Sequence, residues 1–347
     1  MKPYLILSID GGGVRGALSA RLLQRITEAV PSLIRDANLI AGTSTGAIIA
    51  LMLANGASPA EIVEDYKTLV PKVFGHPRYG RAWRAKYAVT PLREALVEHF
   101  GDKTTLGNLE KEVLITSTSV DGRASTKAVE QLPTHAGGFW RPAVFTNIQG
   151  SPDVDLTAVE AALRSSAAPT FFPVRDGYVD GGLWANNPST VALAKVLLHY
   201  SNLRRSDVRI LSIGTGQWRR TIRGSEDMGI AQWSPYLLDL LLDASALHTD
   251  LNAAYMLKEN YCRLSPAFDI PIVLDDPTAV PELLDLADAT DVDNAVAFLR
   301  RRRRRRTSSW PQQQQQGRED NNNDILDVLR FHHDVVDLAW IDAVREK

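Results

Sequence analysis

Cysteine, metal-binding motifs and long apolar segments are scarce or missing in this 347-residue chain. The single cysteine, Cys262, excludes an intramolecular disulfide and is expected to be a packing residue. No apolar run approaches the 18 residues of a membrane-spanning helix, and the longest, Leu237–Leu242, is broken by Asp239. Without a His/Cys cluster or an H-E-x-x-H pattern, we predict neither a metal nor a cofactor. Because residues 1–3 lead directly into an apolar segment, we expect no signal peptide and a cytoplasmic protein, peripheral at most on the inner membrane surface.

Strand-like and helix-like segments alternate along most of the chain, and 44% of the residues are hydrophobic. This pattern predicts an α/β fold with a mostly parallel sheet covered by helices. A capping box at residues 58–61 and a Thr-Pro start at residues 90–91 mark two of the helices, and the second is expected to end before Gly101. The predicted strands lie near residues 4–9, 38–41, 113–119, 178–180 and 208–213.

A serine lies between two glycines at a predicted strand-to-helix junction. Residues 42–46 read Gly-Thr-Ser-Thr-Gly, between the apolar runs 39–41 and 47–51. Small residues on both sides let the two backbone segments approach closely, so the turn projects the Ser44 hydroxyl at the start of a helix. The positive end of that helix favours a developing alkoxide. Although a Gly/Ser turn is the alternative, the correct flanks favour a nucleophilic Ser44.

A glycine-rich loop precedes this serine. Residues 10–16 read Asp-Gly-Gly-Gly-Val-Arg-Gly and separate the apolar run 4–9 from a helical pattern over residues 17–30. Such a loop aims several backbone N–H groups at one point, where a phosphate or a reaction oxyanion can bind. The letters also satisfy G-x-G-x-x-G, which leaves a dinucleotide-binding loop as the main alternative. Asp36, the potential ribose-binding acid, does not end a clear second strand, so the oxyanion interpretation is favoured.

Asp180 ends a predicted strand and is followed by two glycines. Read alone, this is an ordinary Asp-Gly turn. Together, the three motifs resemble the patatin-like phospholipase family in their order and spacing. Residues 161–172 and 208–216 also resemble family segments, and the resemblance covers roughly residues 4–298. It implies a three-layer fold and a serine lipid acyl hydrolase, a phospholipase A-type esterase, that attacks (phospho)lipid carboxylic esters.

The resemblance also implies a Ser–Asp dyad, with Ser44 as the nucleophile and Asp180 as the base. It places the oxyanion hole at the backbone amides of Gly12, Gly13, Val14 and Arg15. The remaining motif glycines are Gly11, Gly16, Gly42, Gly46, Gly181 and Gly182. None of the seven histidines lies in a motif that suggests a triad partner, although the sequence leaves a Ser-His-Asp arrangement open.

Two other functions stay open at this point. One is a nucleotide-activated or otherwise gated membrane-degrading effector of the same fold. The other is a noncatalytic protein that binds a nucleotide with its glycine-rich loop. A lipid ester is the expected substrate, and nucleic acid is not the expected partner. The sequence defines neither the lipid headgroup, nor the acyl position, nor the oligomeric state.

Two segments are candidates for contact with an anionic membrane. Residues 70–89 carry five cations, no acidic residue and four interleaved aromatic residues, a pattern suited to a bilayer interface; a basic loop with inward aromatics is the alternative. The second is the run Arg300–Arg306, which is read mainly as solvated charge. We therefore divide the chain into a hydrolase domain, residues 1–299, a low-complexity linker, residues 300–323, and an amphipathic C-terminal helix, residues 324–347.

Overall fold

A central sheet organises the protein. The computed structural model describes residues 3–80, 83–121, 140–219, 221–222, 227–270 and 272–301. Across the sheet the strand order is β4 (Arg141–Thr146), β3 (Glu112–Ser119), β2 (Leu39–Thr43), β1 (Tyr4–Ile9), β6 (Val208–Ile213) and β8 (Tyr261–Leu264). The five strands from β3 to β8 are parallel, whereas β4 and the short strand β5 (Tyr178–Asp180) pair antiparallel with β3.

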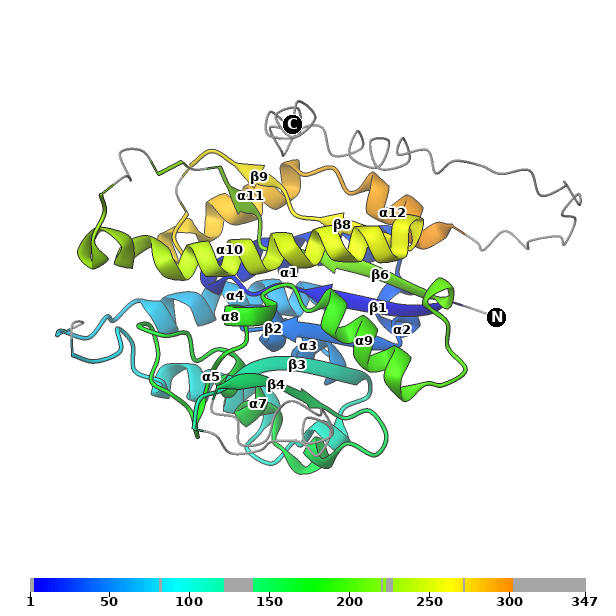
Figure 1. The fold of residues 1–347 in the computed structure, drawn as a ribbon, viewed down its shortest axis with the longest axis horizontal. Helices are drawn as coiled ribbons and strands as arrows, with labels where there is room; N and C mark the ends of the chain where they lie inside the picture. The colour runs from blue at the N-terminus through cyan, green and yellow to red at the C-terminus, as the bar shows by residue number, and fades with distance from the viewer. Residues whose placement is uncertain are drawn as a thin grey trace, which may run out of the picture. The chain divides into compact units, whose positions relative to one another are not determined.

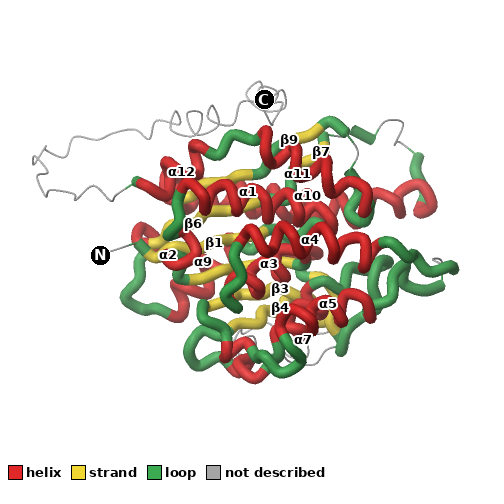
Figure 2. The backbone as a smooth tube through the Cα atoms, turned by 180° about the vertical axis from the view of Figure 1, so that it is seen from behind, coloured by secondary structure: helices red, strands yellow, loops and turns green. Residues whose placement is uncertain are grey.

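Helices cover both faces of this sheet. Figure 1 shows three of them in front, namely α8 (Gly182–Ala185), α9 (Ser189–His199) and α10 (Ile230–Leu257). Figure 2 shows the opposite face, covered by α1 (Gly16–Ala29), α3 (Thr45–Ala54), α4 (Pro59–Phe74), α5 (Thr90–Phe100), α7 (Ala158–Ser165), α11 (Val280–Ala289) and α12 (Asp293–Arg300). The fold is therefore the predicted three-layer α/β arrangement.

The alternation of side chains along the strands explains the two apolar layers. In β1, Leu5, Leu7 and Ile9 pack toward α1 and α3, while Ile6 packs on the other side against the residues of α9. The parallel strands β1, β2, β3 and β6 are largely buried because helices cover both faces, as expected for a parallel sheet. Within the described ranges, no helix combines the length and the hydropathy needed to cross a bilayer.

The predicted helix starts and stops are confirmed in the main. Ser58 caps α4 with a complete capping box, and α5 runs from Thr90 to Phe100, ending before Gly101. The short helix α2 (Leu33–Asp36) contains Asp36, which therefore does not end a strand. Two further strands, β7 (Gln217–Trp218) and β9 (Ala267–Phe268), form a separate small sheet.

Two strands of the main sheet, β4 and β8, were not predicted. β4 begins with Arg-Pro and β8 is only half-buried, so neither shows a continuous apolar run. α12 extends through Arg300, and the Arg300 guanidinium donates to the Ala29 carbonyl at 2.8 Å. The arginine run thus begins inside the folded domain. The rest of the predicted linker and the predicted C-terminal helix lie outside the described residues.

The most important feature for function is that β2 and β5 share one edge of β3. Thr43, the last residue of β2, pairs with Thr116 of β3. Asp180, the last residue of β5, pairs with Ser117, the next residue along β3. Because β2 runs parallel to β3 and β5 runs antiparallel, their carboxyl ends meet head to head. This register brings the residue after Thr43, which is Ser44, next to Asp180.

Candidate active site

Ser44 lies on a strained turn between β2 and α3. Its backbone angles are φ 53° and ψ −121°, a combination that residues with a side chain rarely adopt. The turn closes because glycines allow direct backbone contact: a Cβ on Gly42 would lie 2.2 Å from the Gly46 carbonyl oxygen. A Cβ on Gly46 would lie 2.3 Å from the carbonyl oxygen of Ile9. The elbow that the sequence predicts is therefore present, packed against the end of β1.

Further contacts hold the elbow in place. The Ser44 amide donates to Ser165 Oγ at 2.8 Å, and its carbonyl accepts from the amides of Ala47 and Ile48 in the first turn of α3. α3 is buried along its whole length, so its amino end meets the site without competing solvent. That helix end places partial positive charge beside the hydroxyl.

Asp180 is buried, with only 3% of its surface exposed. Its Oδ1 accepts from the Gly182 amide at 2.7 Å, and its own amide donates to the Ala167 carbonyl at 3.0 Å. Burial raises the pKa of Asp180 to about 6, although the hydrogen bonds from the Gly182 amide and the Ser44 hydroxyl favour the charged form. The Asp180 carboxyl therefore interacts with the Ser44 hydroxyl, and its pKa lies closer to neutral pH than that of an exposed aspartate.

The glycine-rich loop presents its amides unequally. The Val14 amide donates to the Leu274 carbonyl at 2.8 Å, and the Arg15 amide donates to the Gly12 carbonyl at 3.1 Å. The amides of Gly12 and Gly13 have no acceptor within the described part of the chain, and both residues line the same pocket as Ser44. Of the four predicted donors, these two are the ones that the geometry leaves available.

A buried ion pair fixes the start of this loop. Arg263 of β8 contacts both carboxylate oxygens of Asp10, at 2.8 and 2.5 Å, and also donates to Ser212 Oγ at 2.8 Å. Burial alone lowers the pKa of Arg263, but the Asp10 carboxylate outweighs it, so the pKa is raised and the guanidinium stays charged. The ion pair therefore links the start of the loop to β8. Removing one partner would leave a buried charge uncompensated.

A mostly apolar pocket opens onto Ser44 and Asp180. Its polar wall contains Gly12, Gly13, Ser166 and Asn186. Most of the remaining wall consists of aliphatic and aromatic side chains from α3, α4, α5, α10, the segment after α7 and the segment after β9: Ile48, Leu69, Val70, Val73, Phe74, Leu92, Phe171, Phe172, Leu242 and Leu274. A pocket with this lining suits an apolar ligand whose polar group lies next to Ser44 and Asp180.

No histidine of the described residues lines this pocket. His76, His99, His199 and His248 lie elsewhere: His99 pairs with Asp65 at 3.3 Å, and His248 bonds to Asn252 at 2.9 Å. The remaining three histidines lie outside the described residues. Cys262 does not line the pocket either, and burial raises the pKa of its thiol to about 11.

Sequence reasoning missed Asn186 as a site residue. The short helix α8 returns the chain toward the glycine-rich loop, where the Gly11 amide donates to the Asn186 carbonyl at 3.0 Å. Asn186 lines the pocket together with Ser44 and Asp180. Its only signal in the sequence is its position six residues after Asp180. This spacing alone does not distinguish an asparagine of the site from one that caps a helix.

Known proteins match the chain over most of its length. The family described as patatin-like phospholipase matches residues 7–193. Protein teg of Priestia megaterium is 29% identical over 86% of this chain and 98% of that protein. A cGAMP-activated phospholipase of Vibrio cholerae is 31% identical over 73% of this chain and 77% of that protein. The 85/88 kDa calcium-independent phospholipase A2 of Rattus norvegicus is 28% identical over 78% of this chain, but over only 36% of its own length.

The contact between Gly46 and β1 gives a direct test of the elbow. Gly46→Ala places a methyl group against the carbonyl oxygens of Ile9 and Asp10, and neither strand nor helix can move away cheaply. We expect the free energy of unfolding, measured by urea denaturation, to fall by roughly 1–3 kcal/mol. Gly229→Ala is the matched control, because its Cβ would meet only the flexible Gln232 side chain at 3.4 Å. Equal stability of the two variants would contradict the close packing of the elbow on β1.

Proposed function

Because the chain belongs to the patatin-like phospholipase family, we propose that it hydrolyses carboxylic ester bonds of lipids through an acyl-Ser44 intermediate, with Asp180 as the base. One observation carries this proposal: β3 holds the ends of β2 and β5 together, so that the Ser44 hydroxyl interacts with a buried carboxyl whose pKa is raised to about 6. The apolar pocket beside them supports a lipid acyl chain as the substrate group.

The first half of the reaction follows from these positions. Asp180 accepts the proton of the Ser44 hydroxyl while Ser44 Oγ attacks the ester carbonyl carbon. The negative charge that develops on the carbonyl oxygen is bound by the amides of Gly12 and Gly13, which are held in place by the glycine-rich loop. Asp180 then returns the proton to the leaving alcohol as the ester bond breaks. Since a carboxylate is a weak base for an alcohol, fixed geometry supplies much of the rate enhancement.

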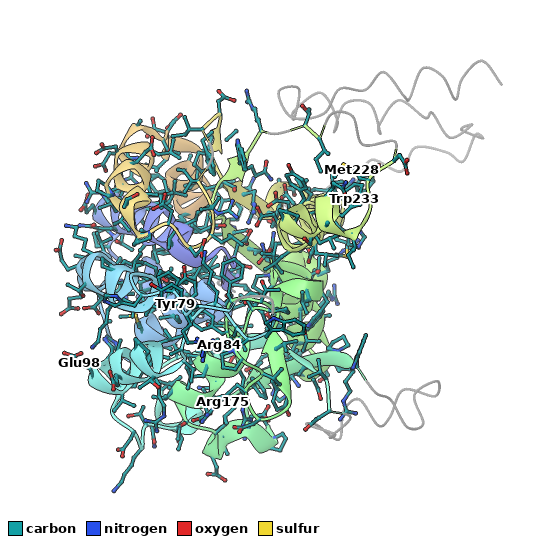
Figure 3. The ribbon with its side chains drawn as sticks, turned by 90° about the vertical axis from the view of Figure 1, so that its left-hand side faces the viewer. Tyr79, Arg84, Glu98, Arg175, Met228 and Trp233 are labelled. Carbon is teal, nitrogen blue, oxygen red and sulfur yellow. The ribbon has the colours of Figure 1, made fainter. Side chains whose placement is uncertain are left out.

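Access to a bilayer would come from the segment between α4 and α5. Tyr79 and Trp83 are 91% and 93% exposed, and Figure 3 shows Tyr79 and Arg84 on the face where Trp233 also lies. The segment is anchored next to the pocket by Tyr87. Its ring centroid lies 5.1 Å from that of Phe74, which lines the pocket. We call Tyr79 and Trp83 the aromatic rim. Exposed aromatic residues of this kind favour the interface of a membrane.

Charge on this segment is partly compensated within the protein. Lys72 pairs with Glu98 and Lys86 pairs with Asp275, so neither presents a full charge to solvent. Arg78 and Arg84 donate to backbone carbonyls of Ala85 and Tyr79, and among the described residues neither has an acidic partner. These two arginines are therefore the cations that would contact anionic headgroups. Arg81 lies outside the described residues.

A gated enzyme is the second candidate function. It is supported by the relative from Vibrio cholerae, whose name describes activation by cGAMP. The probe is cGAMP itself: a gated enzyme would hydrolyse phospholipid vesicles only in its presence, whereas a constitutive one would be indifferent. A dinucleotide bound by the glycine-rich loop is less well supported, because the Gly12 and Gly13 amides line the pocket that holds Ser44.

Substitution of the two polar residues tests the dyad. Ser44→Ala removes the nucleophile and Asp180→Asn removes the base, so each should lower kcat on a p-nitrophenyl ester by at least about 10²-fold. Asp180→Asn should remain folded and gain stability at pH 8, by roughly 3 kcal/mol, because it no longer buries a charge. The histidines provide the control. If His76→Gln, His99→Gln, His199→Gln or His248→Gln matched the loss of Asp180→Asn in a folded protein, a triad would replace the dyad.

The raised pKa of Asp180 sets the pH dependence. Only the ionised carboxylate accepts a proton, and its folded-state pKa is about 6, so kcat/KM should fall about tenfold per pH unit below pH 6 and level off above it. The sign for stability is opposite: the neutral carboxyl is favoured by burial, so its stabilising effect is lost as the pH rises through 6. A kcat/KM profile that stays flat down to pH 4.5 in a folded enzyme would contradict the role of Asp180.

The aromatic rim makes a separable prediction. The double variant Tyr79→Ala/Trp83→Ala should sediment at least about tenfold less with phosphatidylglycerol vesicles and hydrolyse them more slowly, while keeping its kcat/KM on a soluble short-chain ester. Leu198→Ala is the control, because Leu198 is 79% exposed but lies near Tyr200, which packs against Tyr4 at the start of β1. Vesicle binding that is unchanged in the rim variant would place the membrane contact elsewhere.

A further inference from the structure

The carboxamide of Asn186 has an acceptor that the protein does not use. The residue is only 5% exposed, and no group among the described residues donates to its Oδ1. A buried carbonyl oxygen that loses its water partners without gaining a donor is destabilising, so such atoms are rare in folded proteins. Asn186 also lines the pocket with Ser44 and Asp180. A donor for its Oδ1 would therefore be a molecule that enters the pocket during the reaction.

Asn186 Oδ1 lies close to both residues of the proposed dyad. The point where a Cβ of Gly11 would stand is 2.3 Å from Asn186 Oδ1 and 3.2 Å from Ser44 Cβ. The point where a Cβ of Gly182 would stand is 3.0 Å from Asn186 Oδ1 and 3.1 Å from Asp180 Oδ1. The amide oxygen therefore lies within about 6 Å of both Ser44 Cβ and Asp180 Oδ1, and Asn186 lines the same pocket as these two residues.

The orientation of the carboxamide is determined by its neighbours. Its Nδ2 donates to the Gly11 carbonyl at 3.3 Å, and the opposite orientation would bring two carbonyl oxygens together. The backbone is held as well, since the Asn186 carbonyl accepts from the Gly11 amide and the Asn186 amide donates to Ser245 Oγ at 3.1 Å. Oδ1 is thus a fixed acceptor, which cannot stabilise an oxyanion and requires an O–H or N–H donor.

A molecule with two O–H groups enters the site only during deacylation. During acylation the Ser44 hydroxyl has a single proton, and Asp180 accepts it. During deacylation a water molecule takes the place that the Ser44 hydroxyl has during acylation, and it carries two O–H groups. One of them donates to Asp180, and the other would remain unpaired in an apolar pocket unless a second acceptor were present.

We propose that Asn186 is a further catalytic residue, which orients the hydrolytic water for attack on the acyl-Ser44 ester. This inference rests on the proposed function. The water oxygen forms a bond to the acyl carbon while one of its protons passes to the Asp180 carboxylate and its other O–H stays bonded to Asn186 Oδ1. The Gly12 and Gly13 amides bind the oxyanion. The bond from the acyl carbon to Ser44 Oγ then breaks, Asp180 returns its proton to Ser44 Oγ, and the fatty acid leaves.

Water therefore needs two acceptors, whereas an alcohol that attacks the same ester needs only one. Asn186→Leu keeps the approximate volume of the side chain and removes both its donor and its acceptor. With a p-nitrophenyl ester in a stopped-flow instrument, we expect a burst of about one equivalent of p-nitrophenol followed by a kcat lowered by about 10²-fold. Acylation should slow by less than about fivefold. Added methanol should restore turnover more strongly in the variant than in the wild-type enzyme.

Two further variants separate this role from a structural one. Ser245→Ala loosens the Asn186 backbone but keeps the carboxamide, so its partition between water and methanol should equal that of the wild type. If Asn186→Leu does not fold, Asn186→Asp keeps an oxygen at the site and adds a negative charge beside Asp180. The acid limb of its kcat/KM profile should move upward by at least about one pH unit.

The outcomes distinguish the inference from the function on which it rests. If the wild-type enzyme forms no acyl-Ser44 at all, the proposed function fails. If acyl-Ser44 forms but Asn186→Leu deacylates at the wild-type rate, or loses acylation and deacylation equally, the role of Asn186 is wrong and the dyad stands. An Asn186→Asp profile that coincides with the wild type would likewise overturn the inference.

Discussion

The pairing of β2 and β5 with the same edge of β3 is the constraint on which the site depends. Thr43 and Asp180 occupy consecutive positions along β3, and side chains reinforce that register. The hydroxyls of Thr43 and Thr116 lie 2.7 Å apart, and Thr118 Oγ1 donates to the Asp180 carbonyl at 2.8 Å. A shift of one residue would turn Asp180 to the other face of the sheet and separate it from Ser44.

The same junction determines the electrostatics. Because both strands end inside the protein, the Asp180 carboxyl is removed from water, and burial raises its pKa to about 6. The Gly182 amide limits this rise, as does the interaction with Ser44. In the proposed role of base, a carboxylate that is ionised at neutral pH yet poorly solvated would be stronger than one in water, at a cost in folding stability. The strained backbone of Ser44 is a second local cost at the same place.

The local parts of the site could be predicted from the sequence, and its long-range parts could not. Glycines around Ser44 and an apolar run on each side are short-range signals, so the elbow, β1 and α3 were predicted. The register of β3 with β5 joins Ser117 to Asp180 across a long stretch of chain and leaves no local pattern. Likewise, four backbone amides of the glycine-rich loop look equivalent in the sequence. In the structure, the Val14 amide donates to the carbonyl of Leu274, which lies far along the chain. The unpaired oxygen of Asn186 depends on the same distant contacts.

Covalent labelling is the most direct test of whether Ser44 is a nucleophile activated by Asp180. The measurement is the reaction of the full-length protein with a fluorophosphonate, followed by mass spectrometry of its peptides. We predict a single adduct on Ser44, formed at a rate that rises with pH through about 6 and is lost in Asp180→Asn. An adduct on another residue, or labelling of Ser44 that is equally fast in Asp180→Asn, would contradict it.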